Sequence, residues 1–396
     1  MYKRNIHLLY VIIFFHNLIP AYIIERLYWQ ERGMVVGLVV WTEIIYALTV
    51  VILEVPSGLL ADRWGRRPMI IISSLLGFLE LFILLYATHF THFALAIFLA
   101  GVGKASGSGA WNALLYDSLA QQGLENEFEK VLGRQIAIDF SAALLAALSG
   151  SLAAAYWGMT SNYQLSILSA SIALGFAFFL KEPPLKSEAE EQSQSFKQIA
   201  SKALTFFRSH KSVGFIICQA MFIAACVVYV DEFWQIYFGD INFPLVWFGV
   251  IGALFVLARI PGGLLASRLL SKISSAKLMF WLTATTALAV WQIALSQSLW
   301  GVLGFTVLFF CSGMLEPISL GFMHRQADAE ARATIDSLAS LIERIFVTFI
   351  GLSFGYLADY FNIFYGFTLL ACLLTLACCF IPLAQKRLEK SSSTNS

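Results

Sequence analysis

Charged side chains are scarce in this sequence, and four of them lie close together between positions 58 and 67. Asp62 is followed there by Arg63, Arg66 and Arg67, and a second carboxylate, Asp117, ends a later apolar run. Guanidinium groups bind carboxylates through charge-assisted, often paired hydrogen bonds. A carboxylate at the carboxyl end of its own helix opposes the helix dipole, so Asp62 needs such a partner. These residues predict a cluster of ion pairs that acts as a gate between helix ends.

Two glycines flank Asp62 in this group. Gly58 removes a side chain where its helix could approach a neighbour closely. Gly65 permits a tight reversal of the chain, and Pro68 suits the first turn of the helix that follows.

Polar residues also lie inside long apolar runs, where an ionisable group costs about 3 kcal/mol or more unless it is paired or wetted. The candidates for a substrate or proton cavity are Asn17, Lys104, Ser108, Trp111, Asn112, Asp231, Trp234, Ser312 and Glu316. A structural ion pair is the alternative for Lys104 and Glu316, and a solvated rim is the alternative for Asp231 and Trp234. Glu80 also lies inside a run, and the sequence suggests no role for it.

Lys104 begins the polar face of one predicted helix. Ser108, Trp111 and Asn112 follow it at i+4, i+7 and i+8, which places them on one side of a continuous helix. Small residues, which allow close helix packing, occupy another face: Gly103, Gly107 and Ala110.

The composition indicates a membrane protein. With 59% hydrophobic residues, 13% charged residues and a mean hydropathy of +0.74, the chain has too little polar surface for a water-soluble fold. About 20 apolar residues cross the hydrocarbon core. Twelve such runs occur, at 5–24, 35–61, 69–87, 93–117, 134–155, 162–180, 212–238, 245–267, 278–296, 300–322, 335–357 and 362–384. We therefore expect an all-α membrane protein with twelve transmembrane helices.

The chain repeats itself at an offset of 205 residues. The segment from Glu54 to Ala61 recurs from Arg259 to Ala266, and Trp29 recurs as Trp234. Internal repeats of this kind are typical of secondary transporters. The sequence predicts two pseudosymmetric six-helix bundles, at 1–180 and at 212–396 with a short cytoplasmic tail, joined by a cytoplasmic linker at 181–211.

The distribution of basic residues predicts the orientation. If the amino terminus is cytoplasmic, 21 of the 26 lysines and arginines fall on the cytoplasmic side, and Arg26 and Arg32 fall outside. We expect a multi-pass protein of the cell membrane with both termini in the cytoplasm. The absence of an Asn-x-Ser/Thr glycosylation site favours a prokaryotic source.

The segment from Gly58 to Arg67 resembles the motif between spans 2 and 3 of the major facilitator superfamily, Gly-x-Leu-Ala-Asp-Arg-x-Gly-Arg-Arg/Lys. The resemblance implies the fold of that family, a cavity lined by spans 1, 4, 7 and 10, and an Asp62 held by the amino end of span 11 and by the loop arginines. The chain departs from the family pattern in two places. Ser267 stands at the repeat position of Asp62, and Gly103 stands where the family often has a span-4 arginine.

The repeat and the resemblance together predict two ion pairs between the halves. At the offset of 205, Glu54 matches Arg259 and Asp139 matches Arg344. In the family, span 2 meets span 11 and span 5 meets span 8, which would pair Glu54 with Arg344 and Asp139 with Arg259. The alternative is that each charge pairs within its own half.

These observations favour a secondary active transporter that works by alternating access. The leading hypothesis is proton-coupled efflux of small amphiphilic or drug-like compounds, as in antiporters of multidrug resistance. The alternatives are proton-coupled transport of a specific polar metabolite such as a sugar or siderophore, and a non-transporting membrane sensor or scaffold. The motifs indicate no enzyme, catalytic residue, metal or cofactor. The expected partners are a small-molecule substrate, protons and the bilayer, with no nucleic acid, and the expected state is a monomer.

Exchanging the charges of Glu54 and Arg344 tests the first of the predicted pairs between the halves. Glu54→Arg and Arg344→Glu should each lower transport by about tenfold or more, because each would place like charges opposite one another on two facing spans. The double variant should recover part of the transport measured in vesicles. A double variant no better than the worse single one, with both singles folded, would contradict the pairing.

Overall fold

The computed structural model describes residues 3–183, 211–326 and 329–393. Most of the predicted linker, residues 184–210, lies outside this part of the chain. The chain divides into two compact units, one formed by Met1–Glu188 with Pro244–Ala253 and the other by Ala189–Phe243 with Leu254–Ser396. The described residues form helices and no strand, so the prediction of an all-α protein is confirmed.

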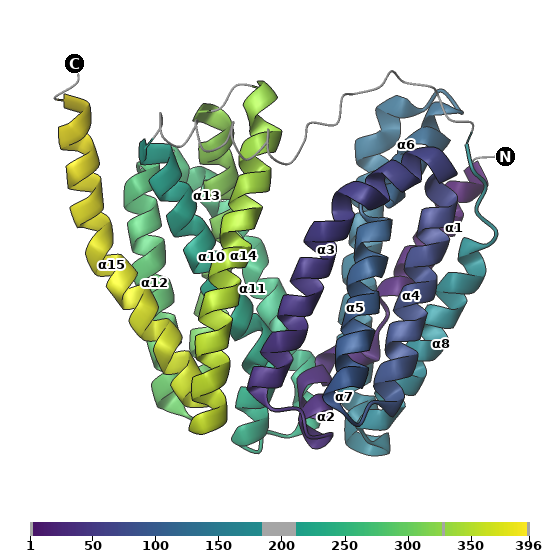
Figure 1. Ribbon diagram of the computed structural model, residues 1–396, viewed down its shortest axis with the longest axis horizontal. Helices are drawn as coiled ribbons and strands as arrows, with labels where there is room; N and C mark the ends of the chain where they lie inside the picture. Colours follow the sequence, from purple (N-terminus) through teal and green to yellow (C-terminus); the bar gives the residue numbers. More distant parts are fainter. Residues whose placement is uncertain (1–2, 184–210, 327–328, 394–396) are drawn as a thin grey trace. The chain divides into compact units, whose positions relative to one another are not determined.

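Unit 1 contains the elements that run from purple to blue-teal in Figure 1. Its helices are α1 (Lys3–Asn17), η1 (Pro20–Ile23), α2 (Glu25–Glu31), α3 (Val36–Trp64), α4 (Arg66–Tyr86), α5 (Phe90–Gly107), α6 (Ala110–Ala120), η2 (Glu125–Glu127), α7 (Phe128–Trp157) and α8 (Met159–Ala177). Within the unit, α5 packs against α3 and α4, and α8 packs against α1 and α4.

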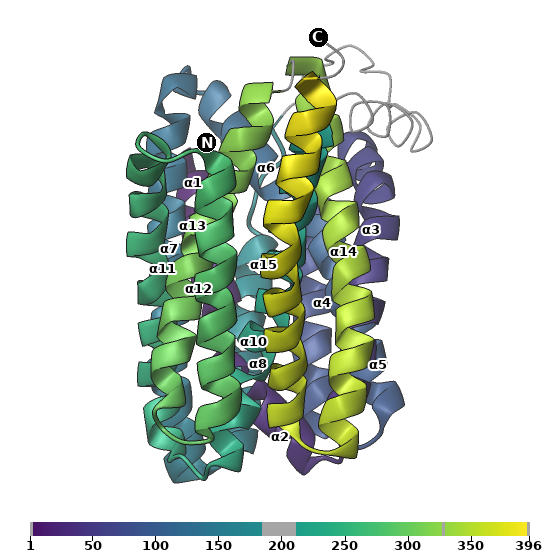
Figure 2. The same cartoon turned by 90° about the vertical axis from the view of Figure 1, so that its left-hand side faces the viewer.

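The rest of the described chain contains α10 (Lys211–Asp240), η3 (Leu245–Trp247), α11 (Phe248–Leu270), α12 (Ser275–Ser296), α13 (Gly301–Gln326), α14 (Ala329–Tyr360) and α15 (Ile363–Ser393). The start of α11 and η3 group with unit 1, and the remainder belongs to unit 2. Figure 2 shows α12 alongside its packing partners α13 and α15.

Eleven helical stretches in the described chain are long and apolar enough to cross a membrane, one fewer than the twelve predicted runs. The run at 162–180 corresponds to α8, which is not among the eleven. Its sequence explains the difference, because its serines, Asn162 and Gln164 lower its hydropathy. Three of these polar residues, Asn162, Ser166 and Ser169, face a neighbouring span that is broken.

The first predicted span is not one continuous helix. It breaks after Asn17, turns through the 3₁₀ segment η1 and resumes as α2. Within a bilayer, the backbone groups that such a break frees must find partners inside the protein. α8 supplies them: Asn162 Nδ2 donates to the Pro20 carbonyl oxygen (2.8 Å), Ser166 Oγ accepts the Ala21 N–H (3.0 Å), and Ser169 Oγ donates to the Phe15 carbonyl oxygen (2.8 Å).

A repeated helix contact is built differently in the two units. In unit 1, Ser57 Oγ of α3 donates to the Ala105 carbonyl oxygen of α5 at 2.8 Å. At the offset of 205, Ser57 corresponds to Gly262 of α11 and Ala105 corresponds to Phe310 of α13. Gly262 lies so close to the Phe310 carbonyl oxygen that a side chain would not fit. Gly313 of α13 lies against the Arg259 carbonyl oxygen in the same way.

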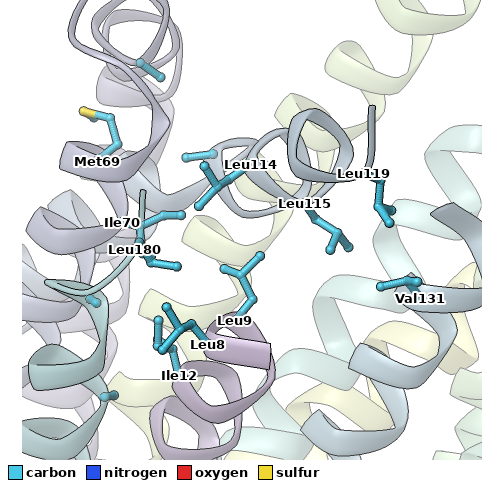
Figure 3. Close-up of a cluster of buried hydrophobic side chains, with 14 residues drawn as sticks. Leu8, Leu9, Ile12, Met69, Ile70, Leu114, Leu115, Leu119, Val131 and Leu180 are labelled. Carbon is cyan, nitrogen blue, oxygen red and sulfur yellow. The ribbon is translucent and has the colours of Figure 1, made fainter. Parts of the chain in front are cut away.

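An apolar cluster at one end of unit 1 joins six of its helices (α1, α3, α4, α6, α7 and α8) and the residues after α8 (Figure 3). Its labelled side chains are Leu8, Leu9, Ile12, Met69, Ile70, Leu114, Leu115, Leu119, Val131 and Leu180. Four of them, Met69, Leu115, Leu119 and Leu180, lie two residues in sequence from the charged positions 67, 117 and 182. The cluster therefore fixes the backbone from which the predicted gate projects.

Replacing Asn162 tests the support that α8 gives to the broken span. Asn162→Ala removes the hydrogen bonds to the carbonyl oxygens of Pro20 and Gly150. Each buried group left unpaired costs about 1–3 kcal/mol, so thermal unfolding of the purified protein should begin several degrees lower.

Ser171→Ala is the control for this change, because Ser171 is exposed and bonds within its own helix. Equal unfolding temperatures for the two variants would contradict the role of Asn162.

Candidate functional site

The turn between α3 and α4 has the geometry that its glycine predicts. Gly65 has φ +96° and ψ 165°, and its N–H donates to the Ala61 carbonyl oxygen at 3.0 Å, which ends α3. Residues with a side chain rarely adopt this φ. Pro68 lies in the first turn of α4, as expected. Gly58 differs from its expectation, because a Cβ there would meet no atom within 4 Å; the predicted close helix approach at Gly58 is wrong within unit 1.

Arg66 joins two carboxylates from different helices. Its Nη1 lies 3.1 Å from Asp62 Oδ1 at the end of α3, and its Nε lies 3.0 Å from Asp117 Oδ2 on α6. Arg66 is 21% exposed, whereas Asp62 is 71% exposed. The guanidinium presents two separate nitrogen atoms to the two acids, whereas the three donors of a lysine share one nitrogen. Arg63 is exposed.

Glu182 is a member of this cluster that the sequence analysis missed. Its Oε1 accepts the Arg66 backbone N–H and its Oε2 accepts the Arg67 backbone N–H, both at 2.7 Å. These N–H groups at the start of α4 have no partner within the helix, and the helix dipole favours a carboxylate there. Arg67 Nη2 also donates to the Phe178 carbonyl oxygen at 2.9 Å. The sequence analysis assigned Glu182 to the cytoplasmic linker at 181–211, and only its place directly before Pro183 and Pro184 set it apart.

The predicted continuous helix around Lys104 is wrong, because the fourth span breaks at Ser108 and Gly109 between α5 and α6. The predicted polar face and the predicted small-residue face nevertheless differ in exposure. Lys104, Ser108 and Asn112 are exposed and Trp111 is half-buried, whereas the small residues are buried: Gly103, Gly107 and Ala110. Gly107 packs against Ser73 of α4, which explains why a small residue is needed there.

His16 of α1, which the sequence analysis did not single out, lies beside this face. Its ring centroid is 5.9 Å from that of Trp111, and Lys104 lies within electrostatic reach of both His16 and Asp139 of α7. Asn17, the next residue along α1, is half-buried and donates to the Ile13 carbonyl oxygen at 3.0 Å. A lone histidine in an apolar run was the available signal.

In unit 2, Asp231 of α10 and Arg259 of α11 form an ion pair. The distance from Arg259 Nη2 to Asp231 Oδ2 is 2.5 Å, and the side chains are 40% and 46% exposed, respectively. The guanidinium also lies over the Phe309 ring, 4.7 Å from its centroid. Arg259 therefore pairs within its own half here, which is the alternative to a pair with Asp139.

The structure places the other predicted residues of this half as follows. Trp234 is buried against Phe238 and Phe255, and Ser312 Oγ donates to the Phe309 carbonyl oxygen at 2.8 Å. Glu316 belongs to α13, and its side chain lies outside the described part of the structure. Glu54 and Arg344 belong to different units, and their pairing stays a prediction, as does any contact of Asp62 with span 11.

A second ion pair occupies a repeat-related place in unit 1. Arg26 Nη2 lies 2.6 Å from Glu43 Oε1, and the guanidinium lies 4.6 Å from the Trp29 ring centroid. Arg26 is 5% exposed. At the offset of 205, Arg26 matches Asp231, so the two units use opposite charges at this position. Glu80 is buried within electrostatic reach of Tyr22 and of Glu25.

Comparison with known proteins identifies the family. A model of the Major Facilitator Superfamily matches residues 6–352. The chain belongs to this superfamily. An uncharacterized transporter of Buchnera aphidicola subsp. Acyrthosiphon pisum (strain APS) is 26% identical to it over 329 residues, which cover 78% of this chain and 77% of that protein.

Solved structures of transporters share the fold. The nucleoside transporter NupG matches with a TM-score of 0.77 and 13% identity, covering 96% of this chain and 99% of its own. The D-xylose-proton symporter matches with a TM-score of 0.69 and 13% identity, covering 96% and 97%. Together with the family match, these structures confirm the major facilitator fold that the motif and the repeat predicted.

Arg66→Lys tests the two-acid bridge of this superfamily member. A lysine keeps the charge but has one nitrogen in place of Nε and Nη1, so the separate contacts with Asp62 and Asp117 are lost and transport in vesicles should fall by about tenfold while expression stays normal. Asp62→Asn should also lower transport sharply, because it removes one of the two partners.

Arg63→Lys is the matched control and should transport normally. If Arg66→Lys matched this control, the bridge would have no part in the transport cycle.

Proposed function

We propose that this membrane transporter is a proton-coupled secondary transporter that works by alternating access, with the ion pair of Asp231 and Arg259 as its coupling element. The observation that supports this most directly is the 2.5 Å contact between two half-exposed charged groups within membrane spans. Charges at this depth are costly and mark ion or substrate pathways. A proton on Asp231 would remove the negative charge that holds Arg259, so protonation and the arrangement of α10 and α11 are linked.

The exposure of the pair matters as much as its charge. A fully buried pair could not exchange protons or meet a substrate without opening, whereas Asp231 and Arg259 remain accessible in this conformation. Arg259 also gains stabilisation from the Phe309 ring. A cationic amphiphile offers the same two features, a positive charge and a group that packs on an aromatic ring, and can compete with Arg259 for Asp231.

This competition favours small amphiphilic or drug-like cations as substrates, exported in exchange for protons. A polar metabolite is the second candidate, and the face around Lys104 favours it. His16, Lys104, Asn112 and Asp139 supply hydrogen-bond donors and acceptors that suit hydroxyl or carboxylate groups. The solved transporters of nucleosides and of D-xylose with protons act on molecules of that kind.

The setting completes the proposal. We place the protein in the cell membrane of a bacterium as a monomer with both termini in the cytoplasm, following the distribution of lysines and arginines. The bundles are the predicted domains 1–180 and 212–396, joined by the linker at 181–211.

Flux into proteoliposomes with an imposed pH gradient tests the coupling. Labelled organic cations and labelled nucleosides or sugars are screened on the wild-type protein, which should move one class in a gradient-dependent manner. Asp231→Asn should lose at least about tenfold of the gradient-driven flux, because the variant cannot bind the proton.

Asp240→Asn is the matched control, since Asp240 is an exposed acid at the end of the same helix. Full gradient dependence in Asp231→Asn would contradict the proposal and move the coupling site to Glu316, where Glu316→Gln would then be expected to abolish it. A wild-type protein that moves no compound of either class would favour the sensor or scaffold hypothesis.

A further inference from the structure

The residues that follow α8 are fixed by helices from elsewhere in unit 1. Asn5 of α1 donates from Nδ2 to the Lys181 carbonyl oxygen (2.8 Å), and its Oδ1 accepts the Lys181 N–H (3.0 Å). The same Nδ2 donates to Ser118 Oγ of α6 at 3.0 Å, and both Asn5 and Ser118 are buried. Leu180 belongs to the apolar cluster. The backbone that carries the Glu182 side chain is therefore fixed in position.

The carboxylate of Glu182 fits the start of α4 closely. A Cβ added to Gly65 would lie only 2.7–2.9 Å from the carboxylate atoms, so the glycine at the turn is needed for this approach as well as for its φ angle. Each oxygen serves a different N–H, of Arg66 and of Arg67. A carboxylate offers two acceptors at this spacing, whereas an amide offers one acceptor and one donor.

Contacts with all three acids of the cluster meet at Arg66. Its backbone N–H binds Glu182, and its side chain binds Asp62 and Asp117. The direction of the guanidinium therefore depends on where the first turn of α4 lies. We propose that Glu182 is a positioning residue of the gate, whose carboxylate fixes the start of α4 and thereby holds Arg66 between the two aspartates.

The same arrangement links the gate to the polar face around Lys104. α1 is one 15-residue helix that carries Asn5 near its first turn and His16 near its last. A displacement of α1 at His16 moves Asn5 with it, and Asn5 carries Lys181 and Glu182. Glu182 thus transmits to Arg66 a displacement of α1 that substrate binding beside this helix would cause. This link rests on the proposed transport function, whereas the positioning of Arg66 rests on the hydrogen bonds alone.

Hydrogen–deuterium exchange of the full-length protein in nanodiscs tests the positioning without any substrate. In Glu182→Gln one of the two N–H groups loses its acceptor, so peptides that cover residues 65–69 should exchange at least about tenfold faster. Glu129→Gln is the control, because Glu129 is an exposed acid of α7 outside the cluster. Glu182→Asp, which keeps the charge on a shorter side chain, replaces Glu182→Gln if that variant does not fold. Exchange rates equal to those of the control would overturn the proposal.

A double-variant comparison separates positioning of Arg66 from simple stabilisation of α4. If Glu182 acts through Arg66, Asp117→Asn should cause little further loss of transport in the Glu182→Gln background. Losses that multiply, as for independent sites, would overturn the positioning role. A wild-type protein that moves no compound would refute the transport function and with it the link through α1, and the exchange measurement would still decide whether Glu182 fixes the start of α4.

Discussion

The fold of unit 1 depends on one constraint, which is that a break in a membrane helix must find hydrogen-bond partners inside the protein. The break after Asn17 frees backbone groups of Phe15, Pro20 and Ala21, and α8 satisfies them with Asn162, Ser166 and Ser169. This explains why α8, although a predicted span, is not among the eleven stretches that are apolar enough to cross a membrane. It also explains why α1 can end at His16 and Asn17, where its last turn meets the polar face around Lys104.

A second constraint operates where helices end and charges gather. The first N–H groups of α4 need acceptors, and three acids stand close to the same turn. The three acids have different partners. Glu182 accepts hydrogen bonds from the backbone N–H groups of Arg66 and Arg67, whereas Asp62 and Asp117 bind the guanidinium of Arg66. The apolar cluster beneath holds each contributing helix in place. One arginine thereby connects α3, α4, α6 and the residues after α8.

The sequence predicted what depends on local pattern and composition. Apolar runs located most helices, Gly65 located the turn, and the motif around Asp62 led to the correct family. Contacts between distant segments could not be predicted in the same way. Asp231 and Arg259 are 28 residues apart, and their pairing depends on how α10 and α11 pack. Glu182 was missed because its partners are backbone groups, which leave no mark on side-chain patterns. The breaks near Pro20 and Ser108 escaped because apolar runs continue across them.

The contact between Ser57 and Ala105 and its counterpart between Gly262 and Phe310 have different mechanical consequences. A hydrogen bond is directional, so the serine pins α3 to one register along α5. The glycine contact between α11 and α13 is close packing of backbone atoms, which lacks the directionality of a hydrogen bond. Of these two repeat-related helix pairs, the first is held by a directional hydrogen bond and the second by close packing alone. The Arg259 carbonyl oxygen lies against Gly313 in the second pair, so a shift of α13 relative to α11 would act directly on the backbone that carries the Arg259 side chain.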